Sequence, residues 1–142
     1  MSDNSKRETE FLNLPGSTPY EDRSQTGTLG PAWKLRFSIG EHTILLDLAG
    51  TMRVGRAVDD HEDTSDLTLD LAAYGGYQGG VSRVHALLKL HEGCLYLEDL
   101  GSTNGTRING FQLTARRNYR LRDGDQVEFA RVAARIRFIR PA

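Results

Sequence analysis

Hydrophobic and polar residues alternate in short runs along most of the chain after Trp33. The runs recur about every 8–12 residues and are separated by glycine, aspartate and asparagine, which is typical of short β-strands joined by turns. In residues 135–140 arginine alternates with apolar residues, as expected of a half-buried strand, and Asp123-Gly124 has the composition of a tight turn. The predicted strands are residues 33–39, 43–48, 52–54, 67–70, 86–91, 95–99, 106–108, 118–121, 127–129 and 135–139. Since no stretch sustains a helical period, the sequence predicts an all-β domain built as an antiparallel β-sandwich.

The first 32 residues differ from the rest of the chain in composition and in hydrophobic pattern. They are rich in serine, threonine, asparagine, acidic residues, proline and glycine, and their few hydrophobic residues follow neither a helical nor a strand period. Such a segment cannot bury enough apolar surface to offset the entropy of ordering it. We therefore predict a disordered tail or linker over residues 1–32 and a folded domain over residues 33–142.

Composition and charge exclude several functions. The net charge is only −1 even though residues 105–142 carry nine arginines, so no nucleic-acid partner is expected. No apolar stretch approaches the roughly 20 residues that span a bilayer, and the N-terminus lacks an apolar signal core. We accordingly expect no membrane association and a cytoplasmic location. The single cysteine, Cys94, provides neither an intrachain disulfide nor a zinc site by itself.

Three polar clusters follow or precede predicted strands, which is where a rigid scaffold places binding loops. They are residues 54–56 (Val-Gly-Arg), residues 79–85 (Gly-Gly-Val-Ser-Arg-Val-His) and residues 97–106 (Leu-Glu-Asp-Leu-Gly-Ser-Thr-Asn-Gly-Thr). The spacing of Ser82 and His85 could suggest a nucleophile and its base, but neither an orienting acid nor an oxyanion loop is evident. The acidic residues 59–63 lack a defined ligand spacing and are interpreted as a solvated loop. No enzyme activity, metal or cofactor is therefore expected.

The order of these motifs resembles that of the forkhead-associated (FHA) domain, whose members read phosphothreonine peptides. The matching residues are Gly55-Arg56, Ser82-x-x-His85, Ser-Thr-Asn-Gly-Thr at 102–106 and Asn-Gly at 109–110. The resemblance covers about residues 33–142. It implies a β-sandwich of about eleven strands (FHA/SMAD-like) that binds the peptide with loops at one end, and we expect a monomer.

The resemblance also implies roles for individual residues. Arg56 and Ser82 would hold the phosphate, Thr103 would line the phosphothreonine pocket and Asn104 would bond the peptide backbone. Arg83 is a further candidate contact. The chemistry agrees, because a phosphothreonine carries about −1.5 to −2 charges, which suit the fork of an arginine and the proton of a hydroxyl.

A second set of residues would mainly shape the loops. By the same resemblance these are Gly55, His85, Gly105, Asn109 and Gly110. Residues 71–80, with four glycines and two tyrosines, form a longer segment before Ser82 than the minimal family pattern. This segment could reshape the surface beside the phosphate pocket.

The function predicted from the resemblance is a phosphothreonine-peptide-binding module that acts as an adaptor or regulator in Ser/Thr-kinase signalling. An alternative is a phosphorylation-independent docking scaffold on the same fold, which loss of Arg56 or Ser82 would have indicated; both are present. The partner is a threonine-phosphorylated protein. The tail also offers Thr9, Thr18, Thr26 and Thr28 as potential internal ligands, although a plain linker is the simpler interpretation.

Overall fold

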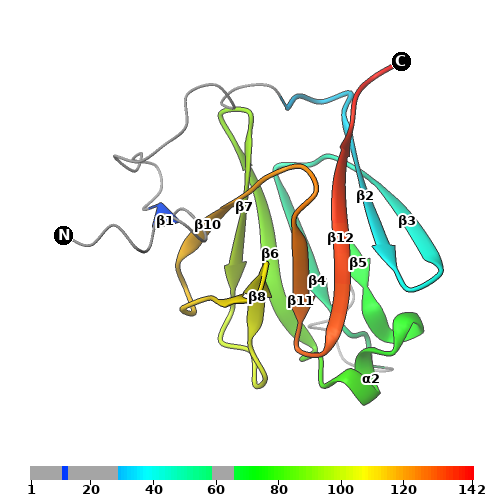
Figure 1. The fold of residues 1–142 in the computed structure, drawn as a ribbon, viewed down its shortest axis with the longest axis vertical. Helices are drawn as coiled ribbons and strands as arrows, with labels where there is room; N and C mark the ends of the chain where they lie inside the picture. The colour runs from blue at the N-terminus through cyan, green and yellow to red at the C-terminus, as the bar shows by residue number, and fades with distance from the viewer. Residues whose placement is uncertain (1–10, 13–28, 59–65) are drawn as a thin grey trace.

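The computed structural model describes residues 11–12, 29–58 and 66–142, which form two six-stranded sheets packed face to face (Figure 1). The first sheet has the order β1 (Phe11–Leu12), β10 (Asn118–Leu121), β7 (Cys94–Asp99), β6 (Val84–His91), β4 (Thr51–Gly55) and β5 (Leu69–Asp70). The second has the order β3 (His42–Asp47), β2 (Lys34–Ile39), β12 (Val132–Ile139), β11 (Gln126–Phe129), β8 (Thr106–Ile108) and β9 (Phe111–Gln112). The predicted all-β sandwich is thus confirmed.

Each of the ten predicted strands overlaps a strand of the structure, but the structure differs from the prediction in three respects. The two-residue strands β1 and β9 were not predicted. The pair β4 and β5 is parallel, whereas the prediction was wholly antiparallel. A 3₁₀ helix, η3 (Leu71–Tyr74), and a short helix, α2 (Gly76–Gly79), follow β5. Asp70 caps η3 by accepting from the backbone N–H of Ala72, whereas α2 has no side-chain cap.

The core lies between the two sheets and follows the strand period. On β2, Leu35 and Phe37 are fully buried, and on the neighbouring β12 Ala134 and Ile136 alternate with exposed arginines. In the other sheet all six residues of β7 are buried. Burial of each large apolar side chain contributes roughly 1.5–3 kcal/mol, so the sheets form a firm platform for the loops between their strands.

The core also includes Leu29, four residues before the predicted start of the domain. Its side chain is buried and its backbone N–H donates to the carbonyl of Gly93 at 3.1 Å. The structure further pairs Phe11–Leu12 with β10, in a segment for which no strand was predicted. The tail threonines and the acidic residues 59–63 lie outside the described residues, so the expectations about them stay predictions.

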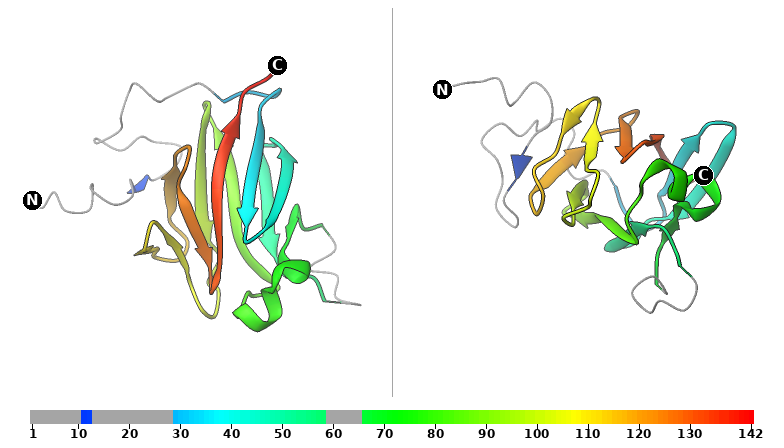
Figure 2. Two further views of the ribbon diagram at one scale, coloured as in Figure 1. Left: turned by 45° about the vertical axis from the view of Figure 1, so that its right-hand side comes forward. Right: turned by 90° about the horizontal axis from the view of Figure 1, so that it is seen from below.

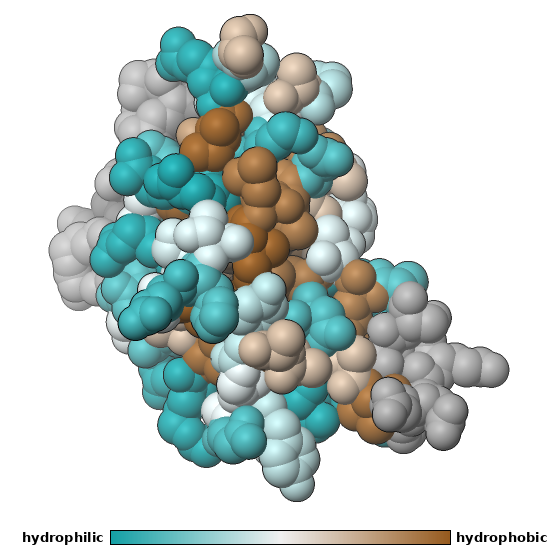
Figure 3. Space-filling view, turned by 90° about the vertical axis from the view of Figure 1, so that its right-hand side faces the viewer, coloured by the Kyte–Doolittle hydropathy of each residue, from teal (hydrophilic) through white to brown (hydrophobic). Residues whose placement is uncertain are grey.

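Apolar side chains reach the surface along the edge strand β3, on the side of the molecule shown in Figure 3. Leu45 is 55% exposed, while Ile44 and Leu46 are half-buried against the core. In the described parts of the chain, no helix is long and apolar enough to cross a bilayer.

The turns at the end of the sandwich where β8 and β10 finish are hydrogen-bonded to adjacent segments of the chain. Asn109 and Gly110 have φ angles of 49° and 85°, which makes the two-residue hairpin turn between β8 and β9. The Asn109 amide donates to a carboxylate oxygen of Asp125 at 2.9 Å and accepts from the backbone N–H of Gln126 at 3.0 Å. Asn109 therefore joins this turn to the start of β11.

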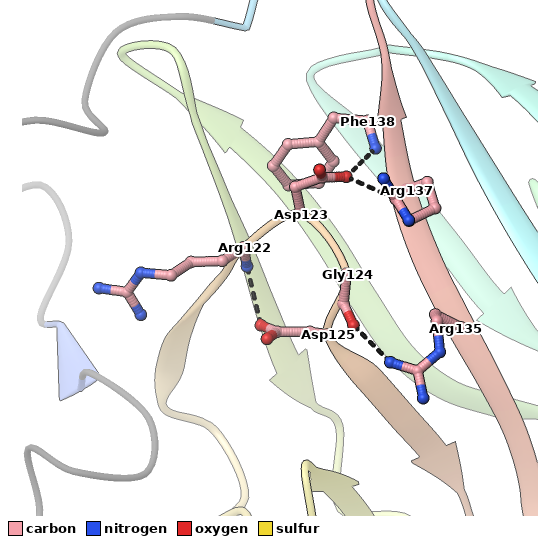
Figure 4. A network of polar contacts seen from close by, with 7 residues as sticks. All are labelled: Arg122, Asp123, Gly124, Asp125, Arg135, Arg137 and Phe138. Atoms are coloured by element: carbon pink, nitrogen blue, oxygen red, sulfur yellow. Dashed lines mark hydrogen bonds and ion pairs between the residues drawn. The ribbon is translucent and has the colours of Figure 1, made fainter.

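The predicted turn at Asp123-Gly124 is confirmed, and a polar network holds it against β12 (Figure 4). The Asp123 carboxylate accepts from the backbone N–H of Phe138 at 2.7 Å and from Nε of Arg137 at 3.2 Å. The guanidinium of Arg135 donates to the carbonyl of Gly124 at 2.7 Å. These contacts stabilise the end of the sandwich that lies away from the three motif loops.

Candidate functional site

The three polar motifs meet at one end of the sandwich, which we call the loop end; it is the lower end in Figure 1 and faces the viewer in the right-hand view of Figure 2. Strand register explains the convergence. Gly55, the last residue of β4, pairs with Val84 at the start of β6, and Ala86 pairs with Asp99, the last residue of β7. The loops that carry Arg56, residues 82–83 and residues 100–105 therefore leave the first sheet along the same edge.

Arg56 lies directly after β4 and is held by two other segments of the loop end. Its backbone N–H donates to the carbonyl of Arg83 at 3.1 Å, and its Nε donates to the carbonyl of Val81 at 2.8 Å. The ring of Tyr77 lies against the guanidinium, with its centroid 5.2 Å from Cζ. Within the described residues the two terminal Nη nitrogens have no hydrogen-bond partner, so the fork is available to an external anion.

Gly55 fits its predicted loop-shaping position because there is no room for a side chain there. A Cβ atom on Gly55 would lie 1.9 Å from the carbonyl oxygen of Arg83. This close approach of two backbones is what allows the Arg56 N–H to reach the same carbonyl. The side chain of Arg83 is exposed at the rim of the loop end.

Ser82 connects the second and third motifs. Its Oγ accepts from the backbone N–H of Thr103 at 3.1 Å, and its own backbone N–H donates to Nδ1 of His85 at 3.0 Å. A serine hydroxyl has one proton to donate. Since Oγ acts as an acceptor toward Thr103, that proton remains for a ligand placed between Ser82 and Arg56.

His85 is fully buried and fixes the loops from below. Nδ1 accepts from Ser82, Nε2 donates to the carbonyl of Gly105 at 2.9 Å, and the ring packs edge-on against Phe129. Burial lowers the pKa of His85 below its ordinary value of 6.5; the bond to Gly105 and the charge of Asp99 act in the opposite direction. The neutral ring with its proton on Nε2 satisfies both contacts, so a structural role agrees with the geometry better than a catalytic base does.

Asp99 organises the third motif, and no role was predicted for it from the sequence. Its side chain is 4% exposed, and its two oxygens accept from the backbone N–H groups of Gly101 and Ser102 and from the hydroxyls of Ser102 and Thr106, at 2.6–3.1 Å. The hydroxyl of Ser102 in turn accepts from the N–H of Gly105 at 2.9 Å. The available signal was an aspartate shortly before a Gly-Ser pair, which is typical of side chains that bond backbone groups in turns.

Thr103 and Asn104 are exposed at the tip of this loop. The amide nitrogen of Asn104 donates to the carbonyl of Gly80 at 2.9 Å, so it braces the neighbouring loop. Its amide oxygen has no hydrogen-bond partner in the described residues. The amide therefore keeps an acceptor, and a second N–H, for a peptide backbone.

The structure brings together most of the residues predicted for the site. Arg56, Ser82, Arg83, Thr103 and Asn104 all lie at the loop end, with Gly55, His85 and Gly105 among or beneath them. Asn109 and Gly110 do not: they form a turn at the opposite end of β8. Among the described residues, no group of three histidine, cysteine or acidic side chains is placed to hold a metal ion.

The buried, neutral His85 predicts a pH dependence of stability. Because its pKa is lowered in the fold, the unfolded chain binds more protons near pH 6.5. The free energy of unfolding should therefore fall as the pH drops below about 6.5, by up to about 1.4 kcal/mol per pH unit, until the folded-state pKa is passed. Urea unfolding between pH 5 and 7.5 measures this slope, and His85→Gln should lose it. An identical slope in the variant would show that other groups cause it.

Comparison with known proteins agrees with this geometry. The family model of the FHA domain matches residues 52–130. Protein FraH of Nostoc sp. is 45% identical over 51 residues, which are 36% of this chain and 18% of FraH, so the match spans under a fifth of that relative.

Solved structures show the same fold. The FhaA FHA domain, solved in complex with the intracellular domain of Rv3910, is 26% identical with a TM-score of 0.55, covering 74% of this chain and 99% of that one. The MEK1 FHA domain, solved with a phosphothreonine peptide of HOP1, is 23% identical with a TM-score of 0.54, covering 72% and 94%. With its motifs at one end of the sandwich and the family model matching more than half of its length, the chain belongs to the FHA domain family.

Proposed function

We propose that the chain binds phosphothreonine peptides at the loop end and acts as a non-catalytic adaptor or regulator. The observation that carries the proposal is the convergence of the Arg56 fork, the Ser82 hydroxyl and the exposed Thr103-Asn104 tip on one small surface. The FHA relatives solved with a phosphothreonine peptide or a partner domain support this use of the fold.

Each residue has a distinct role in the proposed complex. The two Nη groups of Arg56 bind two phosphate oxygens, and the Ser82 hydroxyl donates to the third. Hydrogen bonds of this charge-assisted kind contribute roughly 1.5–3 kcal/mol each, so three of them can hold a short peptide. Asn104 bonds the peptide backbone, Thr103 lines the phosphothreonine pocket, and Arg83 adds positive charge at the rim.

The biological setting follows from the ligand. Phosphothreonine is produced by Ser/Thr kinases, so we place the protein in a Ser/Thr-kinase signalling pathway in the cytoplasm, with a threonine-phosphorylated protein as its partner.

A capture experiment tests this function. The full chain is used to bind proteins from a kinase-competent lysate, with and without prior phosphatase treatment, and the captured proteins are identified. Partners retained only without phosphatase and lost with Arg56→Ala support the proposal. Arg140→Ala is the matched control, because Arg140 follows β12 at the other end of the sandwich. Partners that survive phosphatase treatment would indicate phosphorylation-independent docking instead.

The proposed pocket should also distinguish phosphothreonine from phosphoserine. If the γ-methyl group is buried beside Thr103, its transfer from water contributes about 0.8 kcal/mol, or roughly a fourfold gain in affinity. Paired titrations of one peptide in the two phosphorylated forms measure this ratio. Equal affinities would show that the γ-methyl group is not enclosed.

A further inference from the structure

The glycine-rich segment before Ser82 places an aromatic side chain beside the proposed phosphate site. Helix α2 lies at the loop end, at the bottom of the molecule in Figure 1 and in the left-hand view of Figure 2. Its residue Tyr77 is 73% exposed, and within the described residues only Leu45 is a comparably exposed large hydrophobic side chain. An exposed aromatic ring on a four-residue helix contributes nothing to the core, so its position needs another explanation.

The helix that carries Tyr77 is fixed to the sandwich. The backbone N–H of Val81 donates to the carbonyl of Gly76 at 2.9 Å, and that of Arg131 donates to the carbonyl of Gly79 at 3.0 Å. The lack of a side chain at Gly79 lets the helix lie flush on β12, because a Cβ atom there would be 2.7 Å from a methyl carbon of Val132. Tyr77 is thus held on a rigid base, which lowers the entropy lost when the ring is covered by a ligand.

Tyr77 also contacts the residue proposed to bind the phosphate. Its ring lies 5.2 Å from Cζ of Arg56, within the range of a cation–π contact. With Nε bonded to the carbonyl of Val81 and Cζ placed over the Tyr77 ring, Arg56 has few orientations left. The contact therefore orients the fork, while much of the ring surface remains open to solvent.

A bound peptide would pass close to this open surface. Successive residues of an extended peptide are about 3.3–3.6 Å apart. A phosphate held by Arg56 therefore brings the residues one or two positions from the phosphothreonine within reach of the Tyr77 ring. Burial of such an exposed ring is most favourable when an aliphatic or aromatic side chain packs on it.

We propose that Tyr77 is a recognition residue of the peptide site: its ring positions Arg56 and binds an apolar side chain within two residues of the phosphothreonine. This inference rests on the proposed function and adds a sequence preference to it.

The test is a set of phosphothreonine peptides with leucine, alanine or glutamate at each of the two positions on either side, titrated into the wild-type chain, Tyr77→Ala and Tyr77→Phe. At one of these positions the wild-type chain should prefer leucine. Tyr77→Ala should lower the affinity for the leucine peptide about tenfold and the affinity for the alanine peptide only about threefold. The smaller loss comes only from the missing contact between Tyr77 and Arg56, whereas the leucine peptide also loses its contact with the ring. Tyr77→Phe keeps the ring and should stay within about twofold of wild type for every peptide.

Two results would overturn the inference while leaving the proposed function intact. One is an unchanged affinity and preference in Tyr77→Ala; the other is an equal loss for all peptides, which would limit Tyr77 to orienting Arg56. If the wild-type chain binds phosphorylated and unphosphorylated peptides equally, the proposed function fails and the inference fails with it. Thermal melts of both variants should match wild type, since the Tyr77 side chain is exposed.

Discussion

Replacing Arg56 with alanine is expected to reduce the affinity for a phosphothreonine peptide at least about 100-fold, to the limit of detection by calorimetry. The variant loses both Nη donors and the positive charge at the phosphate, and two charge-assisted hydrogen bonds together contribute roughly 3 kcal/mol or more. The fold should survive, because the substitution keeps the bond from the Arg56 backbone N–H to the carbonyl of Arg83 and removes one hydrogen bond within the protein, from Nε to the carbonyl of Val81. Its thermal melt should therefore stay near that of wild type.

Two further variants sharpen this result. Arg56→Lys keeps the charge but loses the planar fork, so an affinity between those of wild type and Arg56→Ala is expected. Arg140→Ala removes an arginine at the other end of the molecule and should bind normally. Unchanged affinity in Arg56→Ala would remove Arg56 from the site, and a large fall in its melting temperature would assign Arg56 a structural role.

The second large effect is expected at Asp99, where alanine should lower the free energy of unfolding by about 3–5 kcal/mol. The Asp99 carboxylate is buried and accepts four hydrogen bonds, three from the loop that carries Thr103 and Asn104 and one from Thr106 at the start of β8. Its loss leaves buried donors unpaired and frees the loop, so peptide binding should weaken as well. Urea unfolding and a peptide titration measure the two effects.

Asp123 is the matched control for this experiment. It is also a carboxylate that accepts from a backbone N–H and a side chain, but its side chain is 49% exposed and it lies away from the loop end. Asp123→Ala should cost only about 1–2 kcal/mol and leave peptide binding unchanged. Equal stabilities of Asp99→Ala and Asp123→Ala would contradict the central position given to Asp99.

The sequence predicted the strands well where alternation extends over several residues. In β12, arginines alternate with apolar residues, as expected because successive side chains of a strand face opposite sides of the sheet. The strand β9 has only two residues, too few to show a period, and pairing partners such as the parallel β4 and β5 depend on contacts distant in sequence. Leu29 was missed because a single apolar residue in a polar segment carries no pattern.

At the site, the motifs identified the loops but not the contacts that hold them. Strand ends brought Arg56 and Ser82 together as expected. The burial of Asp99 arises only when the third loop folds back over it, so the sequence could show no more than an aspartate near a turn. Tyr77 was visible only as part of a glycine-rich segment, because its contact with Arg56 depends on how α2 docks.

The most direct test of the central claim is a calorimetric titration of the full chain with one peptide in two forms. The peptide is the sequence selected from an oriented phosphothreonine library, and its counterpart carries unmodified threonine. If the Arg56 fork and the Ser82 hydroxyl bind the phosphate, the phosphorylated peptide should bind at least about 100-fold more tightly. Equal affinity for the two forms would contradict phosphothreonine recognition and leave docking without phosphorylation as the use of this surface.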